Sequence, residues 1–191
     1  MKYEIKYSKE NAPKVGLVTN AISGAFSVDG KIEAEGQFRA LFEQFRTEGV
    51  ISQDSIFYEK RTFDMHDAQE VAELFGRERV DVMILLESAF PNGNAFLTLA
   101  NDPYLFKIPL IVTAPYEIEL AGRPEWTTNA WCGVIMSNYV AKQIDRKIFP
   151  LAGWPNDPDF QDELKMLLNV GHAIKEMRKD FLGRFGDAPG G

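Results

Sequence analysis

The most reactive side chain in the sequence is Cys132, the only cysteine, within "TTNAWCGVIM" at residues 127–136. It lies where a helix is expected to begin, and the N-terminus of a helix can activate a thiol as a nucleophile. Nucleophilic catalysis also needs a partner base, and no histidine lies near Cys132 in the sequence. Free cysteine more often behaves as a small buried hydrophobe. We therefore expect Cys132 to pack in the core and to react slowly with thiol reagents in the folded protein.

A carboxylate, Glu87, ends the apolar run "DVMILLE" at residues 81–87. At the end of a strand it could bind a ligand hydroxyl or act as a base. It could equally cap the next helix or pair with a lysine. Thr19 and Asn20 follow the first apolar run and are weaker candidates for substrate contact.

Metal and phosphate sites have little support in the sequence. The two histidines, His66 and His172, lie far apart, and neither has a carboxylate at a metal-ligand spacing. We therefore expect no metal and no other cofactor in this chain. The G-x-G-x-x-G dinucleotide motif is absent. The stretch "TNAISGAF" (19–26) faintly resembles a flavodoxin phosphate loop. However, "SVDG" (27–30) is expected to form a turn, so that "SVDGK" separates this loop from the next helix, which argues against a flavin or phosphate role.

The residues above must be positioned by alternating strands and helices. Apolar, β-branched runs predict strands at 14–19, 54–59, 81–87, 108–114 and 147–153. Helical spacing predicts helices at 32–48, after Asp64, at 94–101, at 129–144 and from Asn156 or Asp157 to Phe181. This alternation indicates an α/β fold: a doubly wound, flavodoxin-like or Rossmann-like parallel sheet with helices on both faces. The run 81–87 is expected at its centre, and Pro150 places 147–153 at an edge.

Ligands on such sheets bind beyond the carboxyl ends of the strands. That rule selects the loops at residues 19–30, 87–94, 113–128 and 153–157. We expect Glu117 and Glu119, within the third of these loops, to be solvated. Residues 1–180 are expected to form one α/β domain, and residues 181–191 the start of a linker or second domain.

Composition excludes several classes of partner. The chain has 191 residues and a net charge of −7, and an acidic surface repels the phosphates of nucleic acid. No stretch is apolar and long enough to span a membrane, and the polar first residues contain no secretory signal. A single cysteine fits a reducing compartment, so we expect a cytoplasmic protein.

The order of several motifs resembles that of the N-terminal domain in the L-fucose/L-arabinose isomerase family. The longest stretch is "TTNAWCGVIMSNYVAKQIDRKIFPLAGWPNDPDFQDEL" (127–164), in which Asn129 to Gly133 resemble the family's N-S-L-C-G-like helix start. The stretches "VGLVT" (15–19) and "LLESAFPNGNA" (85–95) lie where family equivalents do, and the tail "GRFGDAPGG" is similar to the opening of the next domain. By this resemblance Cys132 is mainly a structural mark of the family.

The resemblance implies a function that this chain does not perform alone. Family members interconvert aldoses and ketoses with a divalent metal, usually manganese, whose glutamate, aspartate and histidine ligands lie in later domains. The first domain closes over the active site of a neighbouring subunit in a homo-oligomer. The implied partners are a sugar, other copies of the chain and the remaining domains of a full-length protein.

The resemblance also assigns a sugar-contacting aromatic residue to the loop after the third strand, which is Phe90 in this sequence. Fucose isomerases tend to have tryptophan there, so the preferred sugar is not implied. Phe90 could stack on the apolar face of a sugar, while Asn92 and Asn94 hydrogen-bond its hydroxyls. Alternatively, Phe90 packs under the loop.

Two other functions remain open from the sequence. One is a stand-alone sugar- or nucleotide-binding module of flavodoxin-like fold, and the other is a purely structural oligomerisation domain. A reading frame that continues with further glutamate, aspartate and histidine ligands would favour the isomerase.

Overall fold

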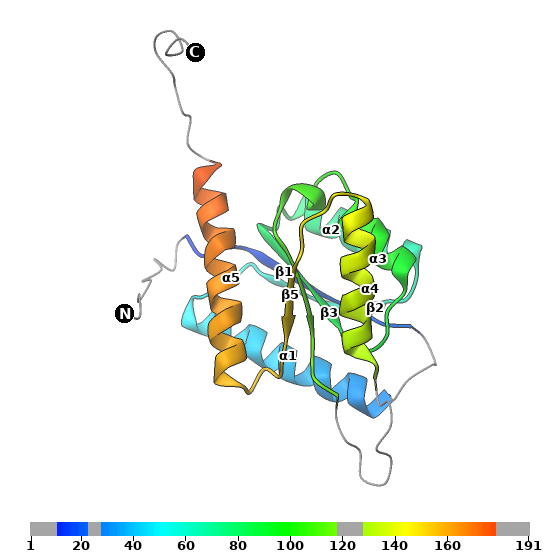
Figure 1. The fold of residues 1–191 in the computed structure, drawn as a ribbon. Coiled ribbons are helices and arrows are strands. Elements are labelled where there is room, and N and C mark those ends of the chain that lie inside the picture. The colour runs from blue at the N-terminus through cyan, green and yellow to red at the C-terminus, as the bar shows by residue number, and fades with distance from the viewer. Residues whose placement is uncertain (1–10, 23–27, 118–127, 179–191) are drawn as a thin grey trace, which may run out of the picture.

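The computed structural model describes residues 11–22, 28–117 and 128–178. Within them, strands and helices alternate along the chain (Figure 1). The strands are β1 (Val15–Asn20), β2 (Ile56–Thr62), β3 (Val82–Glu87), β4 (Leu110–Ala114) and β5 (Phe149–Ala152). The helices are α1 (Val28–Glu48), α2 (Met65–Arg77), α3 (Gly93–Ala100), α4 (Ala130–Gln143) and α5 (Pro158–Met177), with the short 3₁₀ helix η1 (Leu105–Lys107) before β4.

The strands form one parallel sheet in the order β2-β1-β3-β4-β5. This arrangement confirms the predicted doubly wound α/β fold, with β3 at the centre and β5 at an edge. The same order is found in flavodoxin-like folds. Pro150 is exposed on β5, where its missing N–H costs no hydrogen bond within the sheet.

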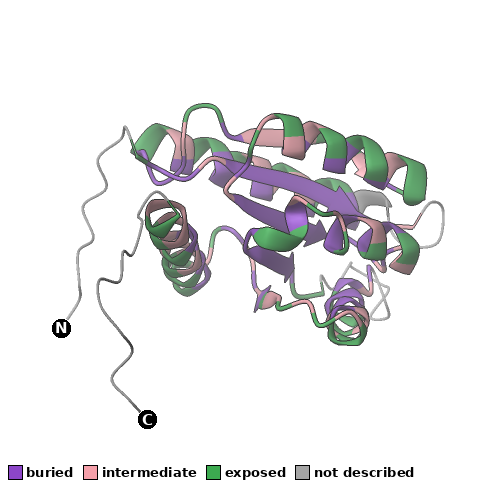
Figure 2. Cartoon of the chain, turned by 90° about the horizontal axis from the view of Figure 1, so that it is seen from above, coloured by how far each residue is buried: buried purple, intermediate pink, exposed green. Residues whose placement is uncertain are grey.

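Helices cover both faces of the sheet, so the three inner strands β1, β3 and β4 are buried along their whole length (Figure 2). One core joins α1 and α5 to the sheet through residues such as Phe38, Phe45 and Leu164. The other joins α2, α3 and α4 through residues such as Phe75 and Phe96. This double cover explains why the inner strands are largely apolar runs in the sequence.

Two helix starts predicted from the sequence are confirmed. The Asp64 carboxylate accepts hydrogen bonds from the backbone N–H of His66 (2.8 Å) and of Asp67 (3.0 Å) at the start of α2. Asp157 accepts from the N–H of Asp159 (3.0 Å), directly before α5, whose first residue is Pro158. A side-chain acceptor at this position satisfies an amide that the helix itself leaves unpaired.

The start of α1 differs from the prediction. A turn was expected at 27–30, but the helix already begins at Val28. The physical reason is that Asp29 and Gly30 are tolerated in a first helical turn, so their turn propensity does not end the helix. The argument against a phosphate loop from an intervening turn is therefore wrong, although residues 23–27 of that loop lie outside the described residues.

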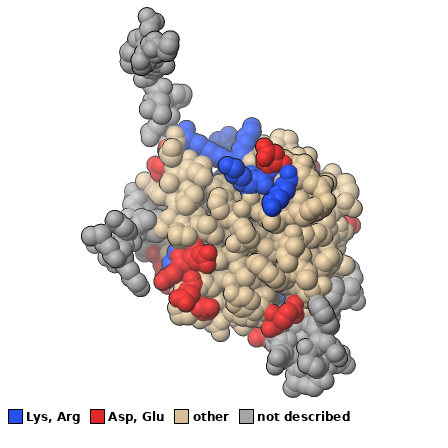
Figure 3. Space-filling view, viewed as in Figure 1, with Lys and Arg blue, Asp and Glu red and all other residues tan. Residues whose placement is uncertain are grey.

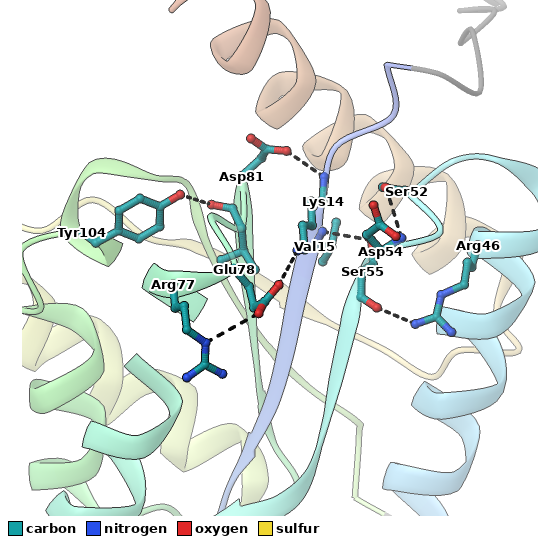
Figure 4. Close-up of polar contacts among 11 residues, drawn as sticks. Lys14, Val15, Arg46, Ser52, Asp54, Ser55, Arg77, Glu78, Asp81 and Tyr104 are labelled. Carbon is teal, nitrogen blue, oxygen red and sulfur yellow. Dashed lines mark hydrogen bonds and ion pairs between the residues drawn. The ribbon is translucent and has the colours of Figure 1, made fainter. Parts of the chain in front are cut away.

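The amino edge of the sheet is held by side chains that bond to strand starts (Figure 4). The N–H of Lys14 donates to the Asp81 carboxylate (2.7 Å), and the N–H of Val15 donates to the Ser55 hydroxyl (3.0 Å). Lys175 of α5 pairs with the same Asp81 at 2.9 Å. These polar groups are occupied in joining α5 and the strands, which leaves the carboxyl edge as the place to look for a ligand.

No helix among the described residues is long and apolar enough to cross a lipid bilayer. The proposed boundary at residue 180 and the tail at 181–191 lie outside the described residues.

Candidate functional site

The candidate site lies where the chain leaves β1 and β3 in opposite directions. These strands are neighbours in the sheet, and from β1 the chain continues to β2 on one side, whereas from β3 it continues to β4 on the other. The two loops therefore diverge at the carboxyl edge. In open α/β sheets such a divergence is the usual position of a ligand-binding crevice.

The backbone of Phe90 ties the loops of this edge together. Its carbonyl accepts from the N–H of Ile22, after β1, at 2.9 Å, and its own N–H donates to the carbonyl of Thr128, before α4, at 2.9 Å. Phe90 itself is half-buried. The loop after β3 is thus fixed on both sides, and Phe90 is neither fully buried nor fully exposed. A contact with sugar stays a prediction.

Glu87, the last residue of β3, is 0% exposed and faces α4. Its Oε1 accepts a hydrogen bond from the Ser137 hydroxyl at 2.7 Å, whereas its Oε2 has no hydrogen-bond partner among the described residues. Burial raises the pKa of Glu87 to about 8, and the Ser137 hydrogen bond lowers it only partly. The group is therefore a neutral carboxylic acid at pH 7. The sequence left open whether Glu87 caps α3 or forms an ion pair with a lysine. Among the described residues it does neither.

Asn20 lies directly opposite Glu87, as its register partner on β1. It is 0% exposed, its Nδ2 donates weakly to the carbonyl of Asn92 (3.5 Å), and its Oδ1 is buried without a partner among the described residues. Thr19 is also buried but points to the opposite face of the sheet, because successive side chains alternate along a strand. Asn20 and Glu87 therefore lie on the same face of the sheet, whereas the Thr19 side chain lies on the other face.

The asparagines of the β3 loop have different positions. Asn92 is the N-cap of α3: its Oδ1 accepts from the N–H of Asn94 (2.9 Å) and of Ala95 (3.4 Å). Its Nδ2 donates to the carbonyl of Phe63 at 2.8 Å. These bonds account for the Asn92 side chain without a ligand. Asn94 is exposed and remains the better placed of the two for a sugar hydroxyl.

Ser137 and Gly133 were not predicted as site residues. A Cβ atom on Gly133 would lie 2.5 Å from Cδ of Pro91 and 3.5 Å from Cβ of Glu87. Only glycine lets α4 pack this closely on the end of β3, which gives the glycine of the family-like motif a physical role. One feature of the sequence could have indicated these two residues. Gly133 and Ser137 are four positions apart, which places both on the same side of a helix.

Glu117 is an exposed loop residue, as predicted, and it also caps the start of α4. Its carboxylate accepts from the N–H of Thr128 (3.0 Å) and of Ala130 (3.2 Å) at the start of α4. It replaces Asn129, whose side chain makes no capping bond and whose backbone is left-handed at φ 56°. Glu119 lies outside the described residues.

The expectation that Cys132 packs in the core is wrong, because Cys132 is exposed. The inner side of α4 is occupied by Ala130, Gly133, Val134, Ser137 and Ala141. Cys132 falls on the outer side, since a residue next to a buried helical position is rotated by about 100° around the axis. The predicted slow reaction with thiol reagents loses its basis.

The described residues contain no group of three or more histidine, cysteine, aspartate or glutamate side chains that could hold a metal. The manganese implied by the resemblance therefore has no set of ligands among the described residues. His66 is exposed near Glu70 (3.6 Å), and His172 is half-buried on α5.

No family model matches the sequence, and no curated protein sequence matches it significantly.

Proposed function

We propose that this chain is a sugar-contacting and self-associating N-terminal domain of an aldose–ketose isomerase of the L-fucose/L-arabinose isomerase kind. The observation that supports it most is the position of Phe90. Phe90 is a half-buried residue at the divergence of the β1 and β3 loops, and its backbone is fixed by hydrogen bonds to Ile22 and Thr128. A rigid backbone holds the ring in place without further ordering when a sugar arrives.

The chemistry of this edge suits a neutral polyhydroxylated ligand. Besides Phe90, exposed aromatic residues follow the neighbouring strands: Phe63 after β2 (37% exposed) and Tyr116 after β4 (57% exposed). Aromatic faces pack against the apolar C–H faces of sugars, and the exposed amide of Asn94 can both donate to and accept from hydroxyls.

Asn20 and Glu87 add two buried polar side chains at the ends of β1 and β3. The unpaired Oδ1 of Asn20 accepts a hydrogen bond, and the protonated Glu87 can donate one. A hydroxyl group or a water does both at once. Because Asn20 and Glu87 are 0% exposed, a sugar reaches them through such a water or after α4 shifts.

In this proposal the chain orients the sugar and excludes water, while proton transfer and the metal belong to other domains. The isolated chain therefore has no isomerase activity. Its affinity for a free sugar is weak, because it supplies only one wall of the site.

The experiment is a titration of the ¹⁵N-labelled chain with L-fucose, L-arabinose and D-glucose, followed by amide chemical shifts up to about 100 mM sugar, the range in which millimolar affinities are measured. We expect saturable shifts of amides in the loops after β1 and β3 and at the start of α4. The absence of saturable shifts for every sugar, or shifts confined to other surfaces, would reject the proposal.

A second function, a nucleotide-binding flavodoxin-like module, is favoured by one observation: α1 begins at Val28, soon after the β1 loop. A helix start in this position favours phosphate. Titration with flavin mononucleotide in the same experiment distinguishes it, because shifts at the first turn of α1 with this ligand alone would select the module.

A further inference from the structure

The outer side of α4 carries an apolar stripe that is exposed among the described residues. Trp131, Ile135 and Tyr139 are 41%, 57% and 65% exposed and recur every four residues, on neighbouring turns. No charged residue occurs between Thr128 and Ala141. A surface helix normally presents charged or polar residues to water. Tryptophan and tyrosine at exposed positions are instead typical of protein interfaces.

The helix α4, which carries the stripe, flanks the edge strand β5 together with α5, and we call this side of the molecule the β5 face (Figures 1 and 2). On α5, Met166 and Val170 are also exposed, at 54% and 40%. The strand itself has four residues, and its exposed Pro150 lacks an N–H. Both features oppose pairing with a strand of another chain. A partner on this face therefore meets helix side chains rather than extending the sheet.

Charges on the β5 face are separated toward its two ends (Figure 3). Lys142 and Lys147 line a hollow of about 340 Å³ together with Arg146 and Asp145, where α4 ends and β5 begins. The first turns of α5 instead carry acidic residues, namely Asp157, Asp159, Asp162 and Glu163. Because α4 and α5 both run from the carboxyl edge of the sheet to its amino edge, the basic cluster and the acidic cluster lie at opposite ends of the face.

We propose that the β5 face binds a second copy of this chain, related by a two-fold axis that passes near Ile135 and makes the two α4 helices antiparallel. Ile135 then faces its own counterpart, and Trp131 of each copy faces Tyr139 of the other. The basic end of each copy lies opposite the acidic end of the other. A parallel arrangement would bring like charges together, which costs free energy.

Self-association is preferred over another partner because the face is complementary to itself in each respect. An isologous interface requires a patch that matches its own copy after a rotation of 180°. An uncharged apolar centre with one acidic and one basic end satisfies that requirement. The inference deepens the self-association part of the proposed function, but it does not depend on sugar binding.

The first test is sedimentation equilibrium of the full chain across about 1–200 μM, a range in which mass action reveals a dimer of ordinary affinity. We expect a monomer–dimer equilibrium. Ile135→Asp is expected to weaken dimerisation at least about tenfold, because it buries a charge at the centre of the interface. The matched control is Ile32→Asp on α1, since Ile32 is 56% exposed, almost as Ile135 is. It should leave dimerisation unchanged.

The second test addresses the orientation of the two copies. The double variant Lys142→Glu/Lys147→Glu has two acidic ends, and the double variant Asp159→Lys/Asp162→Lys has two basic ends. Each alone is expected to dimerise less than the natural chain, whereas an equimolar mixture should form a heterodimer. Added salt should weaken this heterodimer, because the charge pairs are at the rim.

Three results would overturn the inference. One is a monomer at every concentration, even when the sugar titration shows binding at the Phe90 loop. The second is a dimer that Ile135→Asp leaves intact. The third is a mixture of the two charge variants that stays monomeric while the natural chain dimerises, which would reject the antiparallel arrangement. Loss of sugar shifts with an intact dimer would instead reject only the sugar-contact proposal.

Discussion

Asn20 and Glu87 are direct register partners on β1 and β3, and each buries one side-chain oxygen without a hydrogen-bond partner among the described residues. Burying an unpaired polar atom costs free energy, and most proteins avoid it. Two residues with such atoms lie opposite each other on neighbouring strands, at the carboxyl edge of the sheet.

Glu87→Gln should make the stability of the protein less dependent on pH. The pKa of Glu87 is about 8 in the folded state, far above its ordinary value of 4.5. Between these values the folded state holds a proton that the unfolded state has lost, so Glu87 lowers the unfolding free energy as pH rises, by about 1.4 kcal/mol per pH unit. Above pH about 8 the loss is complete.

The measurement is chemical denaturation of both proteins at several pH values from about 5 to 9, a range that covers the titration of this group. Glutamine can still accept from Ser137, so Glu87→Gln should gain stability over the natural chain with rising pH. Parallel pH profiles for the two proteins would show that Glu87 titrates normally and that the buried acid is not neutral.

Gly133→Ala should destabilise the protein by about 1–3 kcal/mol, the usual cost of overpacking. A Cβ atom there would lie 2.5 Å from Pro91, so α4 must move away from the end of β3. Gly36→Ala is the matched control, because a Cβ on Gly36 of α1 meets no atom within 4 Å. This control should gain about 0.5–1 kcal/mol from helix propensity. The measurement is the thermal unfolding of both variants. Equal changes in stability for Gly133→Ala and Gly36→Ala would show that α4 does not pack tightly on Pro91.

Cys132 should react with a maleimide in the folded monomer at nearly the rate of the denatured chain, because its side chain is exposed on α4. The measurement is a time course of labelling, in native buffer and in denaturant, at a protein concentration low enough to avoid self-association. Strong protection in the folded monomer would restore the packing role predicted from the sequence.

Local patterns predicted most of the fold. The strands are short apolar runs, and Asp64 and Asp157 are capping residues directly before helices, so each could be found from neighbours in sequence. The contact between Glu87 and Ser137 spans fifty residues, and that between Pro91 and Gly133 depends on how α4 settles on the sheet. No periodicity encodes such pairs.

The error about Cys132 has a related cause. Apolar residues occur on every side of α4, including the exposed Trp131 and Ile135. The period of the sequence therefore could not tell the buried side from the outer side. The buried side of α4 is defined by the contacts of Gly133 and Ser137 with the end of β3.

The most direct test of the account is the Phe90→Ala variant, measured for both stability and sugar-induced amide shifts. Truncating a fully buried phenylalanine costs about 3–5 kcal/mol. Because Phe90 is only half-buried, we expect a smaller loss in the unfolding free energy, at most about 2 kcal/mol, together with loss of the shifts that the natural chain shows with sugar. In a full-length enzyme the same change should weaken sugar turnover and leave metal binding intact. A loss of stability in the range of a core residue, with unchanged sugar-induced shifts, would contradict the account and assign Phe90 to the core.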